Sequence, residues 1–90
     1  MIDDKQQIAG WLLCWFRKQR LEIVQRSDEE LLRADYFAAE FIDSLGVVEL
    51  IGDAEAKFGI RFDESDFQDR RFSTVEGLAN IIRERVDATR

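Results

Sequence analysis

One serine, Ser44, stands at the start of an amphipathic run and is the side chain around which a reaction could be built. A serine nucleophile ordinarily needs a neighbouring base, and the 90-residue chain contains no histidine. A Ser-His-Asp triad is therefore impossible. A phosphate attached to Ser44 would instead lie at the positive end of the following helix, near free backbone N–H groups.

Acidic side chains follow Ser44 along the same run. Glu49 and Asp53 are four residues apart and share a helix face, with Glu55 near its edge. The opposite face carries apolar residues at i, i+3, i+4 and i+7 spacing, namely Val47, Leu50, Ile51, Ala54 and Phe58. Exposed acids in this position indicate docking to partners with basic surfaces, and the alternative is an ordinary solvated helix face.

Metal and cofactor sites are poorly supported. Without histidine, and with Cys14 as the single cysteine, zinc sites built from Cys and His are excluded. An EF-hand loop starting at Asp63 fails because Phe67 occupies a ligand position, Gln68 replaces the required glycine and Thr74 replaces the closing glutamate. The five glycines form no phosphate-binding loop. We therefore expect a protein without a catalytic site of its own.

The size and charge of the chain further restrict the class of protein to which it can belong. A chain of 90 residues that is 46% hydrophobic predicts one domain, residues 1–90, with a compact core. The net charge of −6 argues against nucleic acid, and no apolar run approaches the roughly 18 residues of a membrane span. The single Cys14 fits a reducing cytoplasm, and we expect it to be packed rather than reactive. Residues 28–69 carry a net −10, so most of the acid surrounds Ser44.

Hydrophobic periodicity predicts three longer helices and one short one. The first spans about 3–20, the second 44–58 with Gly59 as its C-cap, and the short third 63–67. The last opens with the capping box Ser73-Thr74-Val75-Glu76. Their expected buried faces are Ile8, Leu12, Trp15 and Phe16 on the first helix, and Val75, Leu78, Ala79, Ile82 and Val86 on the last. With no alternating strand pattern, the fold class is all-α, a small four-helix bundle.

The long first loop, roughly 21–42, has an irregular pattern. Ser27-Asp28-Glu29-Glu30 fits a capping box and predicts a short helical turn through Leu32. Several apolar side chains should pin the loop to the core, namely Tyr36, Phe37, Phe41 and Ile42. The aromatic residues Trp11, Trp15, Phe16 and Phe37 are expected in the core, with a lining for an apolar cargo as the alternative. Asp63 and Asp66 are interpreted as a solvated helix start, with an acid/base pair as the alternative. Arg83, Arg85 and Arg90 are interpreted as compensation of a helix dipole.

The residues around Ser44 resemble the attachment motif of acyl carrier proteins. The likeness rests on Asp43-Ser44-Leu45 followed by Val48-Glu49-Leu50, and continues through Phe58-Gly59-Ile60 and Phe72-Ser73-Thr74-Val75-Glu76. It covers about residues 36–86. The resemblance implies that a phosphopantetheinyl transferase attaches 4′-phosphopantetheine to Ser44, beside Asp43 and Leu45. The thiol of that arm would carry acyl or aminoacyl groups as thioesters. By position in the family, Asp43, Glu49, Asp53 and Glu55 would dock basic partner surfaces, with Leu45 and Val48 as apolar contacts.

Two departures from the family pattern bear on the cargo. Phe41 and Glu40 stand where many members have glycine before the modified serine, and Phe62-Asp63 stands where the third-helix entry often has proline. This pattern leans towards stand-alone carriers outside bulk fatty-acid synthesis, including aminoacyl or peptidyl carriers of a specialised pathway. Fatty acyl, hydroxyacyl and polyketide cargoes stay open. We expect a monomer, and the other function considered is an unmodified helical interaction module with the carrier fold. For Ser44 itself, the alternative is a plain helix N-cap.

Overall fold

The computed structural model describes residues 4–19, 25–36, 38–39 and 42–88. The elements in chain order are α1 (Lys5–Gln19), α2 (Asp28–Arg33), α3 (Ser44–Phe58), α4 (Glu64–Phe67), the 3₁₀ helix η2 (Arg70–Ser73) and α5 (Val75–Ala88). The described residues form no strand, only an isolated bridge between Asp35 and Thr74. The predicted all-α fold is confirmed. The three longer helices are α1, α3 and α5, and the short helix predicted at 63–67 is α4.

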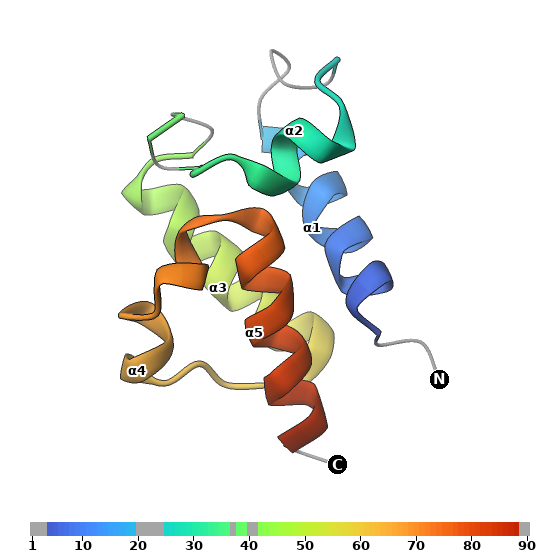
Figure 1. Ribbon diagram of the computed structural model, residues 1–90. Helices are drawn as coiled ribbons and strands as arrows, with labels where there is room; N and C mark the ends of the chain where they lie inside the picture. The colour runs from blue at the N-terminus through green and yellow to red at the C-terminus, as the bar shows by residue number, and fades with distance from the viewer. Residues whose placement is uncertain (1–3, 20–24, 37, 40–41, 89–90) are drawn as a thin grey trace.

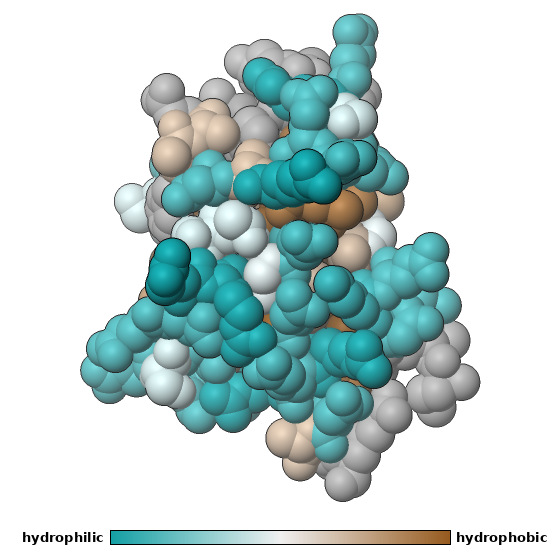
Figure 2. All heavy atoms as spheres, in the orientation of Figure 1, coloured by the Kyte–Doolittle hydropathy of each residue, from teal (hydrophilic) through white to brown (hydrophobic). Residues whose placement is uncertain are grey.

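The core lies between the three longer helices, and α5 is its centre. Helix α5 packs against α1, α2 and η2, while α2 crosses one end of the bundle and α4 lies on the side away from α1 (Figure 1). The surface over α5 is mostly hydrophilic, and apolar core atoms show only in gaps between polar side chains (Figure 2). No helix in the described parts of the chain is long and apolar enough to cross a membrane.

The predicted helix faces are the buried ones. On α1, Ile8, Leu12 and Phe16 are fully buried, and Trp15 nearly so. The stripe of α3 buries Leu50 and Ala54, with Val47, Ile51 and Phe58 half-buried against the core. All five residues predicted for the last helix are buried, together with Ile81. A 3.6-residue period was enough to find these faces because each helix packs one side against the others.

The start of α5 corrects the predicted capping box. The Thr74 hydroxyl accepts a hydrogen bond from the Gly77 N–H at 3.0 Å, so Thr74 caps the helix. Ser73 belongs to η2, and its hydroxyl donates to the Arg70 carbonyl at 3.0 Å. Both residue types favour caps, and the preceding 3₁₀ turn decides between them. The other predicted cap is confirmed, since the Ser27 hydroxyl accepts from the Glu30 N–H at 3.1 Å.

The first loop is fastened to the core through Tyr36, as predicted. Its side chain is fully buried and its ring lies 5.1 Å from that of Phe16. The Tyr36 hydroxyl donates to the Phe72 carbonyl, and its backbone N–H donates to the Ser73 carbonyl at 3.1 Å. Burial, with the nearby Asp35 carboxylate, raises the Tyr36 pKa, so the hydroxyl stays a donor. Ile42 is also buried, whereas Phe37 and Phe41 lie outside the described residues.

Tyr36→Phe should lower the free energy of unfolding by about 1–3 kcal/mol. The substitution keeps the ring in its place but leaves the Phe72 carbonyl without its tyrosine donor in a buried position. Urea titration followed by circular dichroism measures the change as a lower midpoint at constant slope. An unchanged midpoint would mean that the hydroxyl adds nothing to the attachment of the loop.

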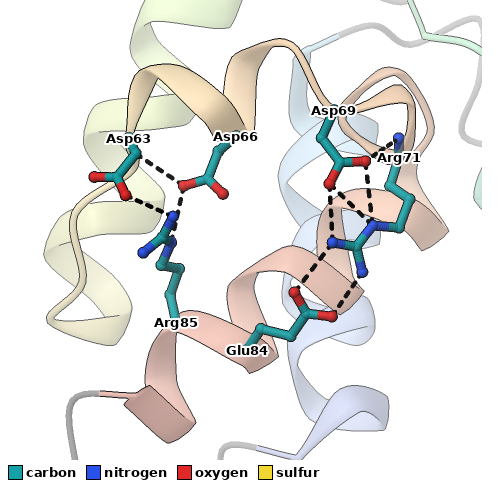
Figure 3. A network of polar contacts seen from close by, with 6 residues as sticks. All are labelled: Asp63, Asp66, Asp69, Arg71, Glu84 and Arg85. Carbon is teal, nitrogen blue, oxygen red and sulfur yellow. Dashed lines mark hydrogen bonds and ion pairs between the residues drawn. The ribbon is translucent and has the colours of Figure 1, made fainter.

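Two arginines fasten α4 and η2 to α5 (Figure 3). Arg85 donates from Nε to Asp66 at 2.9 Å and from Nη2 to Asp63 at 2.8 Å, and the Asp63 N–H also donates to Asp66 at 2.8 Å. Arg71 donates to Asp69 from Nη2 at 2.9 Å and to Glu84 from Nη1 at 2.7 Å. We call these contacts the Arg85 clamp, with Asp63 and Asp66, and the Arg71 clamp, with Asp69 and Glu84. Both clamps join residues of the α4–η2 segment to α5.

These clamps correct two sequence interpretations. Asp66 is not part of a solvated helix start, because it is 8% exposed and is the sole buried charged residue in the described part of the chain. Arg85 does not serve only the dipole of the last helix, because its guanidinium binds Asp63 and Asp66. Asp66 and Arg85 are 19 residues apart, so no local helix pattern relates them. Arg90 lies outside the described residues.

The carboxyl pKa values reflect the clamps. Burial raises the pKa of Asp66, but hydrogen bonds from Arg85 and the Asp63 N–H, together with the Arg85 charge, outweigh it and leave the pKa below its usual value. Hydrogen bonds from Arg71 lower the pKa of both Asp69 and Glu84. A carboxyl with a depressed folded-state pKa stabilises the fold above its unfolded pKa, and that stability is lost as pH falls through the folded value.

We therefore expect the free energy of unfolding to fall with acidification below about pH 4, the pKa of a free carboxyl. Asp66→Asn should cost about 1–3 kcal/mol at pH 7 and should make the acid loss shallower, because one of the titrating groups is gone. Asp87→Asn is the matched control. Its pair with Arg83 is exposed and 3.8 Å long, so its effect should stay within about 0.5 kcal/mol. Urea titrations at several pH values measure the free energy of unfolding of each variant. Equal pH profiles for Asp66→Asn and the unsubstituted chain would contradict the role given to the Asp66 carboxylate.

Cys14 departs from its sequence interpretation. We expected it to be packed within the apolar part of the first helix, but its side chain is exposed on α1. The residues on either side, Leu13 and Trp15, both face the core. The apolar character of that stretch comes from these neighbours, and Cys14 points to solvent.

Candidate functional site

Helix α3 begins with a cap from Asp43. The Asp43 backbone is extended, with φ −100° and ψ −176°, and the Asp43 carboxylate accepts a hydrogen bond from the Gly46 N–H at 2.8 Å. The Asp43 carbonyl accepts from the Val47 N–H at 3.0 Å, which closes the first helical turn. At the other end Gly59, in the left-handed conformation with φ 64°, stops the helix as predicted.

Ser44 is therefore not the N-cap, and the plain-cap alternative is wrong. It occupies the first helical position, its side chain is exposed, and its hydroxyl makes no hydrogen bond with the described residues. Asp43 performs the capping that would otherwise engage a serine hydroxyl. The Ser44 hydroxyl is left available to another molecule.

A phosphate on Ser44 fits this end of the helix. The Gly46 N–H is taken by Asp43, whereas the N–H groups of Ser44 and Leu45 have no acceptor among the described residues. Donors in the first helical turn, together with the helix dipole, favour an anion there.

Apolar side chains stand beside Ser44 on the outer face of α3. Leu45 is 73% exposed and Val48 is 65% exposed, among the most exposed large hydrophobic residues in the described chain. Glu49 is also exposed and makes no hydrogen bond or ion pair with the described residues. At about 100° per residue, Leu45, Val48 and Glu49 share one helix face. The structure brings these three predicted residues together.

The other two acids of α3 lie on its flanks. Asp53 is about 180° around the helix from Ser44, and its Oδ2 accepts from the Trp15 indole N–H at 2.8 Å. Glu55 is half-buried, and its Oε2 accepts from the Phe62 N–H at 3.0 Å. Both carboxylates therefore have partners within the fold. Asp53 keeps an exposed side chain, and Glu55 helps to hold the chain that follows α3.

The aromatic residues of α1 pack as core side chains. Phe16 and Trp15 are buried, and Trp11 is half-buried with its ring 5.4 Å from that of Phe58. Phe37, the fourth member of the predicted cluster, lies outside the described residues, as does Glu40. Sequence reasoning missed the bond from Trp15 to Asp53. The sequence signal for it is a tryptophan in a buried stripe, because a buried indole N–H needs an acceptor.

Residues 18–82 match the family model described as phosphopantetheine attachment site. The match covers more than half of the chain and includes Ser44. The chain belongs to the phosphopantetheine attachment site family. It matches no curated protein and no solved structure. The resemblance to acyl carrier proteins is confirmed at the level of this family.

Membership of this family indicates what the chain carries. Proteins of the phosphopantetheine attachment site family carry 4′-phosphopantetheine covalently, and the group ends in a thiol. The chain is thus a phosphopantetheine-carrying protein. Carrier domains of this kind are generally without catalysis of their own, and they interact with phosphopantetheinyl transferases and partner enzymes.

Proposed function

We propose that Ser44 is the residue that carries 4′-phosphopantetheine, and that the thiol of this arm holds acyl or aminoacyl intermediates as thioesters for partner enzymes. The observation that carries the proposal is the different hydrogen bonding of Asp43 and Ser44 at the start of α3. Asp43 caps the helix, and Ser44 follows with an exposed hydroxyl that no described residue engages. The N–H groups of Ser44 and Leu45 would face the phosphate of the arm.

The surroundings of Ser44 support recognition by other proteins. Leu45 and Val48 present apolar area that a partner could cover, and Glu49 adds a charge beside them. Asp53 adds a second carboxylate on the flank. Partners with basic residues around an apolar contact would complement this surface, and the charged contacts would weaken as salt rises. The proposed setting is a monomer in the cytoplasm.

Intact mass tests the attachment. The purified chain is incubated with coenzyme A, Mg²⁺ and a broad-specificity phosphopantetheinyl transferase, and its mass should rise by one phosphopantetheinyl group. A reductant is included throughout, because the exposed Cys14 could form a mixed disulfide with coenzyme A. The absence of any mass gain with several transferases would contradict the proposal and favour an unmodified interaction module.

The nature of the cargo is tested on the loaded chain. Adenylating enzymes that activate fatty acids or amino acids are offered in turn, each with its substrate and ATP. A thioester on the arm adds the mass of the acyl or aminoacyl group and is removed by neutral hydroxylamine. Because the sequence around Ser44 leans towards carriers outside bulk fatty-acid synthesis, transfer of an amino acid is the first outcome to seek, and acceptance of fatty acyl groups alone would contradict that preference.

A further inference from the structure

The indole of Trp15, on α1, is buried and hydrogen-bonds to α3. The side chain is 7% exposed, and its ring meets that of Phe16 edge to face at 5.2 Å. Its Nε1 lies 2.8 Å from Asp53 Oδ2. Packing fixes the donor, and the donor in turn fixes the orientation of the acceptor.

Asp53 remains open to other molecules despite this bond. Its side chain is exposed, and a carboxylate can accept several hydrogen bonds across its two oxygens. The indole uses one of these positions on Oδ2 and leaves the others for a partner. A carboxylate held in one orientation loses less conformational entropy on docking than a freely rotating one.

The three acids of α3 differ in this respect. Glu49 is exposed and has no contact with the described residues that would fix its carboxylate. Glu55 is fixed by the Phe62 N–H but is half-buried. Asp53 combines an exposed carboxylate with a fixed orientation, and the donor that fixes it belongs to a different helix.

We propose that Trp15 is a positioning residue for partner docking, acting through Asp53. The buried indole N–H holds the Asp53 carboxylate ready on the flank of α3, where a basic side chain of the phosphopantetheinyl transferase binds it. The inference rests on the proposed function, because the transferase is the partner that must recognise the chain before it can be loaded. It assigns Trp15 a role beyond core packing.

Two substitutions separate the hydrogen bond from the charge. Asp53→Asn removes the charge and keeps an oxygen that can accept from the indole, so the fold should be retained. Trp15→Phe removes the donor and keeps the charge. Trp11→Phe is the matched control, since it makes the same change on the same helix at a residue that packs against Phe58. Thermal unfolding is recorded for every variant, and loading rates are compared at a temperature where all are folded.

Loading kinetics with coenzyme A and the transferase provide the readout. Both Asp53→Asn and Trp15→Phe should raise the KM for the chain by roughly two- to tenfold with little change in kcat. Asp53→Asn should also make kcat/KM less dependent on salt. The double variant should match Asp53→Asn alone, because Trp15 has nothing to position once the charge is gone. Trp11→Phe should load like the unsubstituted chain.

Each contrary result overturns the inference. An unchanged KM for Asp53→Asn means that Asp53 serves only to satisfy the indole. An unchanged KM for Trp15→Phe, or a further increase when it is added to Asp53→Asn, means that Trp15 does not act through this carboxylate. These outcomes are distinct from failure of the proposed function, in which the unsubstituted chain would not be loaded at all.

Discussion

Ser44→Ala is expected to abolish loading completely while leaving the fold intact. The substitution removes the oxygen to which the phosphate of the arm would be joined, so no slower route through the same position exists. Stability should change by no more than about 0.5 kcal/mol, because Ser44 is exposed, makes no hydrogen bond with the described residues and is not the cap of α3. Intact mass after incubation with coenzyme A and the transferase measures loading, and thermal unfolding measures stability.

Ser65→Ala is the matched control for this substitution. Ser65 is also an exposed serine close to a helix start, in α4, and its replacement should leave loading unchanged. Loading that persists in Ser44→Ala would place the attachment elsewhere. A marked loss of stability in Ser44→Ala would show that the serine, and not Asp43, supports the start of α3.

Gly77→Ala is expected to have the largest effect on stability. Gly77 lies in the first turn of α5, directly against η2, and an added Cβ would clash with the Arg71 carbonyl oxygen. That oxygen belongs to the backbone of a 3₁₀ turn, so relief requires η2 and α5 to move apart. The 3₁₀ helix η2 carries the Phe72 carbonyl that accepts from Tyr36, and its Arg71 side chain binds Glu84 on α5. We expect a loss of about 3 kcal/mol or more, which lowers Tm by roughly 12 °C or more in a domain of this size.

Gly52→Ala makes the same change where there is room. Gly52 lies within α3, and a Cβ there would have no neighbouring atom within 4 Å. Alanine should stabilise the helix by roughly 0.5–1 kcal/mol, because it restricts the unfolded chain and favours the helix. Calorimetry or thermal circular dichroism of the two variants decides. A Gly77→Ala variant as stable as the unsubstituted chain would mean that η2 and α5 are not packed as closely as described.

Helix positions could be predicted well from the sequence because amphipathic stripes report burial directly. Leu50 and Ala54 on α3, and Leu78 and Ile82 on α5, lie where a 3.6-residue period places them. The start of α3 was predicted at Ser44 and lies there. The choice of cap was harder, because Asp43 and Ser44 are both favoured cap residues and only the extended backbone of Asp43 decides between them.

Contacts between distant residues could not be predicted from local patterns. Asp66 and Arg85 form a clamp across 19 residues, and Trp15 reaches Asp53 across 38. Gly77 reads as an ordinary helix residue until η2 is placed beside it. The acids of α3 illustrate the same limit for the site. Their spacing indicated exposed acids, but it could not show that the Trp15 indole binds Asp53 or that the Phe62 N–H binds Glu55, because both bonds join separate segments.

The most direct test of the account is to locate the attached group on the loaded chain. Trypsin cleavage after Arg33 and Lys57 releases the peptide of residues 34–57, in which Ser44 is the single serine and which contains no threonine or cysteine. We expect this peptide to gain the mass of one phosphopantetheinyl group and fragmentation to assign the group to Ser44. An unmodified 34–57 peptide together with a modified peptide from elsewhere in the chain would contradict it.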